Sequence, residues 1–481
     1  MRIVHAASEM FPYVKTGGLA DVVGALAPAL AVRGHEVEVY LPGYRALLEH
    51  PAAQAAERGA PFAIELGGRA VAGEIHTFRP QAGLAVRLVV RDEFFDRRHL
   101  YWNGRRDYDD NDARFSFFAQ AVVEAIRRDG RGVDVVHAHD WQAGLLPLLL
   151  REAARRDGRV WARRTVFTIH NIAYQGVFPA ASFALTNLPA AYRGIEGGIE
   201  YHGQISLLKA GIAFADRVTT VSPNYAREIR VPGGGCGLDG VLRARGAAVS
   251  GVLNGIDTAV WNPATDPALP ATYNADDLRG KQACRTALLR QVGWGEEFSG
   301  PVFGMISRMT AAKGHDLVLA VADFFRRHKA RLVVLGSGDA AIEEAFRALA
   351  AKLPAKVAVC VRLDEKMSHL VEAGADFFLM PSRAEPCGLN QMYSQAYGTV
   401  PLCGRVGGLV DTVIDLREDP EAGTGFLLEP TEDGLRGALL AAMKLHADKP
   451  WLDAVRRRGM RRDFSWAKPV AAYELLYKTE E

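Results

Sequence analysis

A lysine and two glycines follow the first apolar run of the chain, in the segment Lys15-Thr16-Gly17-Gly18-Leu19-Ala20-Asp21. Glycines let backbone N–H groups approach an anion closely, the start of a helix carries partial positive charge, and a lysine adds a full charge. The segment is therefore a candidate phosphate-binding turn that uses Lys15, Gly17 and Gly18. The alternative is a tight connection between a strand and a helix, with Lys15 on the surface.

The same Gly-Gly-Leu-x-Asp pattern recurs at Gly407-Gly408-Leu409-Val410-Asp411, again just after a predicted strand. This repeat predicts a second helix N-terminus directed at a ligand. Duplication of a purely structural turn explains the repeat equally well.

Two cations follow another predicted buried strand, Arg308 and Lys313 in the segment 307–314. Departure of a nucleoside diphosphate develops negative charge on the bridging oxygen, and fixed Arg and Lys donors can stabilise that charge without a metal. The alternative is a solvated loop that carries two charges.

A carboxylate stands between a predicted buried strand and a predicted helix, Glu385 in the segment 376–391. A carboxylate at this position can bind sugar hydroxyls, and the backbone N–H groups of Gly388, Leu389 and Asn390 are expected at the helix N-terminus, open to phosphate or hydroxyl oxygens. The alternative is that Glu385 only caps the helix.

Histidine, aspartate and asparagine side chains follow two predicted strands, in His137-Ala138-His139-Asp140-Trp141 and in His170-Asn171. Open α/β sheets bind ligands at the carboxyl ends of their strands, and these side chains suit sugar hydroxyls. The spacing of His137 and His139 could suggest a metal, but no third ligand is evident, so we expect no metal.

The fold class predicted by the residues is α/β, because short β-branched runs alternate with helical patterns, as in doubly wound parallel sheets. Predicted strands in the first half are Arg2 to Ala7, Glu36 to Leu41, Leu84 to Val90, Val133 to His137, Thr165 to Ile169 and Arg217 to Val221. Those in the second half are Val302 to Ile306, Arg331 to Leu335, Lys356 to Val361, Asp376 to Met380 and Val400 to Leu402, with a helix expected at His315 to His328.

At 481 residues the chain exceeds the size at which one core usually stops growing, so two domains are expected. We place the boundary near residue 255, with domains at 1–255 and 256–455. The last segment, 456–481, is expected to form a helix that packs back on the N-terminal domain.

Composition excludes several classes of protein. Apolar residues make up 49% and charged residues 24%, and the net charge of +2 comes from interleaved signs, so nucleic acid is not an expected partner. No apolar run approaches the length of a membrane span, so no membrane association is expected. The five cysteines are scattered without a C-x-x-C pair, which favours a reducing cytoplasm over a disulfide framework or a zinc site.

One motif points to a different enzyme class. The segment Gly336-Ser337-Gly338-Asp339-Ala340-Ala341 matches the permissive dinucleotide pattern G-x-G-x-x-A, which would suit a nicotinamide-dependent oxidoreductase. It lies in the second half of the chain and lacks an acidic residue about 20 positions later. A tight turn is the preferred interpretation.

Taken together, the segments 15–22, 137–141, 307–314, 385–391 and 407–412 resemble the motif set of bacterial glycogen synthases and plant starch synthases, in the same order through nearly the whole chain. The resemblance implies a GT-B glycosyltransferase with two Rossmann-like domains that face a deep cleft. It also implies retaining transfer of glucose from ADP-glucose to the non-reducing end of an α-1,4-glucan in glycogen biosynthesis, with release of ADP. Neither a metal nor another cofactor is expected. The N-terminal domain is then the glucan side, and the C-terminal domain binds the donor.

The resemblance assigns roles by position. Arg308 and Lys313 match the pair that binds the diphosphate and assists its departure, and Lys15, Gly17 and Gly18 match a loop that closes on the donor. Glu385 matches the carboxylate at the donor glucose. The other matched positions are His170 beside the reacting sugar, Asp140 and Asn254 in the glucose site, Asp21 after the glycine pair, and Cys387, Gly388 and Leu389 beside Glu385. The resemblance also implies a front-face displacement, and no covalent nucleophile is evident in the sequence.

Two positions depart from the family pattern. Arg362-Leu363 stands where Gly-Tyr is common, and His315 stands where Leu is frequent. The first change makes the adenine preference less secure, so a related retaining enzyme that uses UDP-glucose or another acceptor is the alternative. A catalytically silent glucan-binding protein is a further rival, against which the intact set of matched residues argues.

Overall fold

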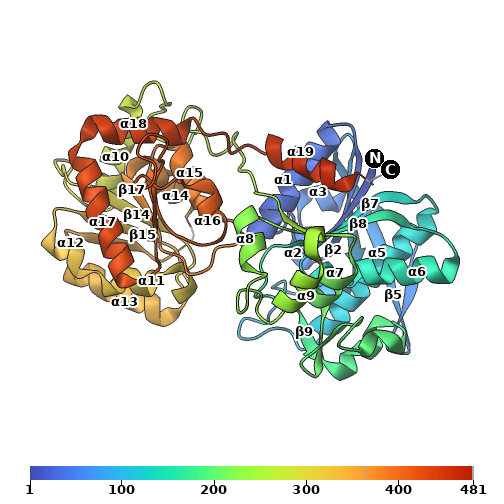
Figure 1. Cartoon of the computed structure of the whole chain (residues 1–481). Helices are drawn as coiled ribbons and strands as arrows, with labels where there is room; N and C mark the ends of the chain where they lie inside the picture. Colours follow the sequence, from blue (N-terminus) through green and yellow to red (C-terminus); the bar gives the residue numbers. More distant parts are fainter. Residues whose placement is uncertain (363, 479–481) are drawn as a thin grey trace. The chain divides into compact units, whose positions relative to one another are not determined.

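The chain divides into two compact units, seen in the computed structural model of residues 1–362 and 364–478 (Figure 1). The first unit contains Met1–Val221, Ala226–Asn254 and the residues from Trp466 onward, and the second contains Ser222–Tyr225 and Gly255–Ser465. The predicted terminal segment, 456–481, begins inside helix α18 (Lys449–Met460), which belongs to the second unit. The chain returns to the first unit only at Trp466.

The first unit is built on a ten-stranded sheet with the order β13-β12-β8-β7-β1-β2-β6-β5-β3, in which β4 also pairs with β5. Neighbours from β13 to β6 run parallel, and the β3, β4 and β5 edge is antiparallel. The strands are β1 (Arg2–Ala6), β2 (Glu36–Pro42), β3 (Glu57–Arg58), β4 (Phe62–Leu66), β5 (Arg69–Gln81), β6 (Leu84–Val90), β7 (Val133–His139), β8 (Ala162–Ile169), β12 (Arg217–Thr220) and β13 (Val249–Gly251). A small separate sheet consists of β9 (Val177–Pro179), β10 (Glu200–Tyr201) and β11 (Gln204–Ser206).

Helices surround this sheet, and the last one comes from the far end of the chain. They are α1 (Gly18–Val32), α2 (Arg45–Leu48), α3 (Pro51–Gln54), α4 (Asp92–Phe95), α5 (Asn111–Asp129), α6 (Leu146–Asp157), α7 (Leu207–Phe214), α9 (Asp239–Ala244) and α19 (Ala467–Tyr477). Helix α8 (Pro223–Glu228) begins in the second unit and ends in the first. Figure 1 shows α19, in red, beside the blue α1, and Glu474 of α19 pairs there with Arg33 at 2.7 Å. Tyr477 of α19 lies with its hydroxyl 2.7 Å from Nδ1 of His137.

The second unit is a six-stranded parallel sheet with the order β16-β15-β14-β17-β18-β19. Its strands are β14 (Val302–Ile306), β15 (Arg331–Leu335), β16 (Val357–Cys360), β17 (Phe377–Met380), β18 (Val400–Gly404) and β19 (Phe426–Leu428). Its helices are α10 (Arg279–Gln291), α11 (His315–Ala320), α12 (Asp323–Arg327), α13 (Ala340–Lys352), α14 (Glu365–Gly374), α15 (Asn390–Ala396), α16 (Gly407–Thr412), α17 (Glu432–Ala447) and α18.

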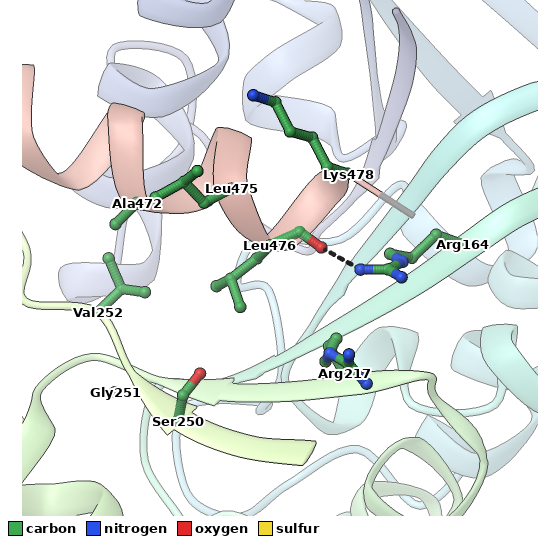
Figure 2. Close-up of a pocket in the computed structure, with 9 residues that line it drawn as sticks. All are labelled: Arg164, Arg217, Ser250, Gly251, Val252, Ala472, Leu475, Leu476 and Lys478. Atoms are coloured by element: carbon green, nitrogen blue, oxygen red, sulfur yellow. Dashed lines mark hydrogen bonds between the residues drawn. The ribbon is translucent and has the colours of Figure 1, made fainter. Parts of the chain in front are cut away.

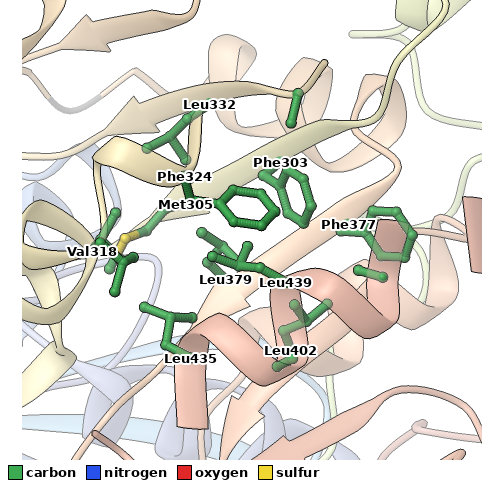
Figure 3. Close-up of a cluster of buried hydrophobic side chains, with 14 of the residues drawn as sticks. Phe303, Met305, Val318, Phe324, Leu332, Phe377, Leu379, Leu402, Leu435 and Leu439 are labelled. Atoms are coloured by element: carbon green, nitrogen blue, oxygen red, sulfur yellow. The ribbon is translucent and has the colours of Figure 1, made fainter. Parts of the chain in front are cut away.

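Alternate residues of these strands pack on opposite faces of the second sheet. Phe303, Leu332 and Phe377 lie in one buried cluster, together with Leu435 and Leu439 of α17 (Figure 3). Val302 and Val333 lie in another buried cluster, with residues of α10 and α14. Strands buried on both faces appear in sequence as continuous apolar runs, which is why they were predictable.

The strands predicted from sequence are all present, with ends shifted by a few residues. The single helix predicted at His315 to His328 is instead two helices, α11 and α12, separated at 321–322. The sequence did not predict the antiparallel hairpin β4–β5 or the short strands β3, β9, β10, β11, β13 and β19. Most of these are short, and short strands carry little periodic signal.

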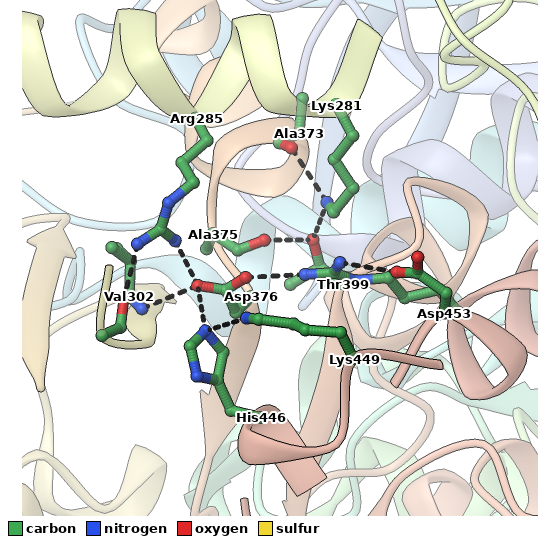
Figure 4. Close-up of polar contacts among 12 residues, drawn as sticks. Lys281, Arg285, Val302, Ala373, Ala375, Asp376, Thr399, His446, Lys449 and Asp453 are labelled. Atoms are coloured by element: carbon green, nitrogen blue, oxygen red, sulfur yellow. Dashed lines mark hydrogen bonds and ion pairs between the residues drawn. The ribbon is translucent and has the colours of Figure 1, made fainter. Parts of the chain in front are cut away.

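A buried carboxylate fastens the amino-terminal edge of the second sheet (Figure 4). Asp376, just before β17, accepts a hydrogen bond from the backbone N–H of Val302 at 2.9 Å and lies 2.6 Å from the Arg456 guanidinium. It also pairs with Arg285 of α10. Burial raises the pKa of Asp376, but the charges of Arg285 and Arg456 outweigh burial and hold that pKa well below its ordinary value. The carboxylate thus joins β14, β17, α10 and α18.

Replacing Asp376 by Asn leaves the buried Arg285 guanidinium without its counter-charge and leaves Arg456 paired only with Asp453 among the described residues. We expect the free energy of unfolding of the second unit to fall by about 3–5 kcal/mol, the usual cost of removing one partner of a buried ion pair. Urea unfolding of the full chain measures this as a lower midpoint. Asp453→Asn is the control, because Asp453 pairs with the same Arg456 but its side chain is 38% exposed, so the expected loss is about 0–1 kcal/mol. Equal midpoints for the two variants would contradict the assignment.

Candidate active site

The predicted site residues of the first unit lie at the carboxyl ends of parallel strands. Asp140 directly follows β7, His170 directly follows β8, and the loop with Lys15 follows β1. These three strands are neighbours in the sheet. Asn254 lies beyond the end of β13, at the same edge. Parallel strands therefore bring together residues that are far apart in sequence, at the edge where open α/β sheets bind ligands.

Asp140 adopts a backbone conformation that is rare for residues other than glycine. Its φ is 53° and its ψ is −177°, and its backbone N–H donates to the carbonyl of Thr168 at 2.9 Å. Its Oδ1 accepts a hydrogen bond from the backbone N–H of His170 at 2.7 Å. Burial raises the pKa of Asp140 to about 7, against two backbone N–H groups that lower it. Strain of this kind persists where the surroundings enforce it, which is common at functional sites.

His170 lies at one end of a row of buried imidazole rings. Its Nε2 is 3.1 Å from Nδ1 of His139, and Nε2 of His139 is 3.1 Å from Nδ1 of His5. The ring of His137 stacks on that of His139, with centroids 4.1 Å apart and an angle of 29° between the planes. The nitrogens of His137 contact Thr168 Oγ1 at 2.6 Å and the Tyr477 hydroxyl at 2.7 Å.

The spacing of these rings could suggest a metal, but their orientation does not. One nitrogen each of His5, His137 and His139 lies within 4.8 Å of the others. The nitrogen lone pairs lie in the planes of their rings, and the planes of His137 and His139 are stacked with centroids 4.1 Å apart, so the lone pairs of these two rings do not converge on one ion. Both nitrogens of His137 and of His139, and Nδ1 of His5, also have hydrogen-bonding partners. The arrangement favours a hydrogen-bonded row of imidazoles.

The loop with Lys15 is held by a residue that sequence analysis missed. The carboxylate of Glu9 accepts hydrogen bonds from the backbone N–H and the hydroxyl of Thr16, the latter at 2.6 Å, and from the Tyr101 hydroxyl at 2.5 Å. Lys15 pairs with Asp21 at 2.6 Å. Burial raises the pKa of Asp21, and the neighbouring Lys15 opposes this. Only the position of Glu9 after the first strand could have suggested its involvement.

Asn254 ends the first unit as a buried side chain. It is 6% exposed, and its Oδ1 meets no hydrogen-bond donor among the described residues. A buried amide oxygen without a donor carries an energetic cost, which a ligand hydroxyl could relieve.

In the second unit, the predicted cation and carboxylate meet directly. The ammonium of Lys313 lies 2.5 Å from the Glu385 carboxylate, and the hydroxyl of Ser382 lies 3.3 Å from the same oxygen. Glu385 is buried, whereas Arg308 is exposed. Among the described residues, no hydrogen bond or ion pair engages the Arg308 guanidinium. Lys313 and Glu385 thus neutralise each other, while Arg308 offers a free positive charge at the same edge of the sheet.

The residues after Glu385 present backbone donors. Gly388 has a φ of 74°, and α15 begins at Asn390, whose side chain donates to the carbonyl of Ile306 at 2.7 Å. The backbone N–H groups of Gly388, Leu389 and Asn390 donate to no other group in residues 1–362 and 364–478. Cys387 is buried, and its carbonyl accepts a hydrogen bond from Gln391 at 3.1 Å. These three N–H groups therefore stay available to an oxygen of a ligand, and their role in binding an anion stays a prediction.

The two Gly-Gly-Leu segments serve different purposes. A Cβ on Gly407, where φ is 45°, would lie 1.8 Å from the carbonyl oxygen of Glu385, and one on Gly408 would lie 2.5 Å from that of Cys387. A Cβ on Gly17 or Gly18 would meet no heavy atom within 4 Å. The second glycine pair therefore lets two loops pack backbone to backbone and positions Glu385. The first pair has no packing reason to be glycine.

The dinucleotide-like pattern at Gly336 has the same structural explanation as the second glycine pair. Gly336 has a φ of 151°, and a Cβ there would lie 1.9 Å from the carbonyl oxygen of Ser307. A Cβ on Gly338 would lie 2.4 Å from that of Met309. These glycines fix the loop that carries Arg308, as a tight turn.

The two departures from the family pattern both follow strands of the second sheet, Arg362 after β16 and His315 after β14. Arg362 is exposed and pairs with Asp364 at 2.8 Å, and Leu363 lies outside the described residues. His315 is fully buried, and its ring contacts the Thr310 carbonyl at 3.3 Å and the Ser307 hydroxyl at 3.5 Å. Burial lowers the pKa of His315 to about 4, so a neutral ring ties the cation loop together.

A cavity of about 470 Å³ lies apart from these residues, between α19 and the strands β8, β12 and β13 (Figure 2). Its lining includes Arg164, Arg217 and Leu476, and Arg164 donates to the Leu476 carbonyl at 2.9 Å. No predicted site residue lines it. Among the helices of the described chain, none has the length and apolar character needed to cross a membrane.

Comparison with known proteins defines the class of enzyme to which this chain belongs. A family model described as "Starch synthase catalytic domain" matches residues 2–244, and one described as "Glycosyl transferases group 1" matches residues 294–448. The fold is GT-B, with two Rossmann-like domains. It is similar to the catalytic domain of starch synthase IV from Arabidopsis thaliana bound to ADP and acarbose, with a TM-score of 0.86 and 33% identity over 99% of this chain and 98% of that one. The protein is therefore a glycosyltransferase.

Proteins that are similar in sequence over the whole chain identify its family within the glycosyltransferases. A glycogen synthase from Opitutus terrae is 58% identical over 478 residues, covering 99% of both chains. A glycogen synthase from an Anaeromyxobacter species is 45% identical over 480 residues, covering 100% of this chain and 99% of the relative. The chain belongs to the glycogen synthase family.

Because the surroundings of Gly17 are open, a substitution at this position can test a role in ligand binding without disturbing folding. Gly17 has extended backbone, with φ at −162° and ψ at −169°, so Gly17→Ala should not change the unfolding temperature. We expect it to lower glucosyl transfer about tenfold, because the methyl group blocks the approach of a phosphate to the backbone. Gly407→Ala should lower both the unfolding temperature and the activity. Thermal unfolding and initial rates check both variants, and full activity of Gly17→Ala would remove Gly17 from the site.

The raised pKa of Asp140 predicts a pH-dependent stability. The folded protein holds this proton up to about pH 7, whereas the ordinary pKa is 3.8, so the stabilisation is complete below pH 3.8 and is lost as pH rises through 7. The stability of wild type relative to Asp140→Asn should therefore fall by on the order of 1 kcal/mol per pH unit between about pH 5 and 7. Unfolding midpoints of both proteins at several pH values measure this difference. A constant difference would mean that Asp140 is already ionised at pH 5.

Proposed function

We propose that the protein transfers glucose from ADP-glucose to the non-reducing end of an α-1,4-glucan, with retention of configuration and release of ADP. Family membership supports the transfer reaction, and the ADP and acarbose in the Arabidopsis structure support an adenine nucleotide and a glucan-like acceptor. The single observation in this chain that carries the proposal is the Lys313–Glu385 pair beside the free cation Arg308.

These three side chains fit a diphosphate that leaves from a sugar. An incoming diphosphate competes with Glu385 for the Lys313 ammonium, and Arg308 adds a second positive charge. Glu385, once released from Lys313, can accept hydrogen bonds from the hydroxyls of the donor glucose. Binding therefore exchanges one ion pair for two charge-assisted contacts, without leaving a buried charge uncompensated.

The chemical step that we propose is a front-face displacement. The bond between C1 of glucose and the diphosphate oxygen breaks, and a bond forms between C1 and the acceptor hydroxyl oxygen on the same face. The acceptor proton passes to the departing phosphate oxygen. Arg308 and Lys313 stabilise the negative charge that develops on the diphosphate, which is the role that fixed donors fill best.

We propose that no metal or other cofactor takes part. Arg308 and Lys313 supply the charge that a divalent cation would otherwise supply at a diphosphate. A cytoplasmic location is also proposed, on the grounds that all five cysteines, Cys236, Cys284, Cys360, Cys387 and Cys403, are free thiols.

The test is incorporation of labelled glucose into glycogen from ADP-glucose and from UDP-glucose in parallel, with and without EDTA. We expect incorporation from ADP-glucose that EDTA does not change. The control is Lys313→Ala, which should fold normally and lose most of its turnover. Preference for UDP-glucose would show that the Arg362-Leu363 change has altered base recognition. Failure with both donors, or inhibition by EDTA, would contradict the proposal.

A further inference from the structure

The row of imidazoles behind His170 ends inside the protein. Nε2 of His5 is buried and has no hydrogen-bond partner among the described residues. At the other end, His170 is 9% exposed, and its Nδ1 bonds to no group in the part of the chain that the structure describes. Between these ends lie two nitrogen-to-nitrogen contacts of 3.1 Å, and each needs one proton.

The number of protons in this row is limited. Burial lowers the pKa of His5 and of His170 to about 3, and burial together with neighbouring rings holds the pKa of His139 well below its ordinary value. The three rings are therefore neutral near pH 7, and each carries one N–H. Two of the three protons occupy the two contacts, which leaves one proton for an end of the row.

Only two arrangements satisfy both contacts. In one, His5 donates to His139 and His139 donates to His170, so that Nδ1 of His170 carries the remaining proton. In the other, His170 donates to His139 and His139 donates to His5, so that Nε2 of His5 carries the remaining proton. The second arrangement buries an N–H without an acceptor, which is the rarer and more costly defect in proteins. The first arrangement leaves only Nε2 of His5 buried as an unprotonated acceptor without a donor in the described part of the chain.

We propose that His139, with His5 behind it, is a positioning residue that fixes the proton of His170 on Nδ1 and so makes His170 a hydrogen-bond donor to an oxygen of the bound sugar nucleotide. The ligand named here rests on the function proposed above. The tautomer assigned to His170 is independent of that function, because it follows from contacts within the first unit. Stacking of His137 on His139, and the bonds from His137 to Thr168 and Tyr477, hold the row in place.

The direct test is the tautomer of His170 in the ligand-free full chain. Histidine labelled with ¹⁵N, observed through two-bond nitrogen–proton correlations, distinguishes the protonated ring nitrogen from the bare one. The signals of His170 are assigned by their loss in His170→Gln. We expect a protonated Nδ1 and a bare Nε2. A protonated Nε2 would overturn the proposal, and this result would stand whether or not the protein transfers glucose.

A matched pair of variants tests whether His139 is responsible. Asn and Leu have the same branched shape, so His139→Asn and His139→Leu leave similar space, but only Asn can place an N–H where Nδ1 of His139 was. We expect His139→Asn to keep the His170 tautomer. His139→Leu should lose it and show a kcat/KM about tenfold below that of His139→Asn, the worth of one hydrogen bond. Equal kcat/KM values with an unchanged His170 spectrum would overturn the role of His139. If His139→Leu does not fold, the wild-type spectrum still decides.

Discussion

All strands of a parallel sheet end at the same edge, and this constraint organises both units of the protein. In the second unit, strand β17 has Asp376 before its first residue and leads to Glu385 beyond its last. The carboxylate at the amino end is locked by two arginines and a backbone N–H. The carboxylate at the other end pairs with Lys313, whose side chain is 24% exposed. Carboxylates with different partners thus stand at opposite edges of one sheet.

The carboxyl edge of the sheet is sterically crowded, because many loops must pass one another within a small space. In the second unit, glycines at the close approaches lack a Cβ, which allows the loops of Ser307, Glu385 and Cys387 to contact neighbouring backbone. The loops are therefore positioned by main chain rather than by apolar side chains, which leaves polar side chains free to face a ligand. Such positioning is well suited to groups that must remain fixed while charge develops.

Sequence predicted the parallel strands and the residue types at their ends, because both follow from local patterns. It did not predict which glycines are structural. Gly17 and Gly407 stand in the same Gly-Gly-Leu-x-Asp pattern, and only the fold shows that the first is open and the second is packed on Glu385. The sequence also did not show which side chains bond to one another. The hydrogen bond between Glu9 and Thr16 and the contact between His5 and His139 are set by tertiary structure. The break between α11 and α12 escaped notice because the apolar spacing continues through it.

The return of α19 to the first unit has a consequence for the order of synthesis. His137 and Tyr477 are in hydrogen-bonding contact across 340 positions of the chain. Ribosomes add roughly 5–20 residues per second, so the partner of His137 is made on the order of tens of seconds after it. The second unit can be completed in that interval, whereas the first unit waits for the last helix. Although it is translated first, the unit with the row of buried imidazoles is thus the last to be finished.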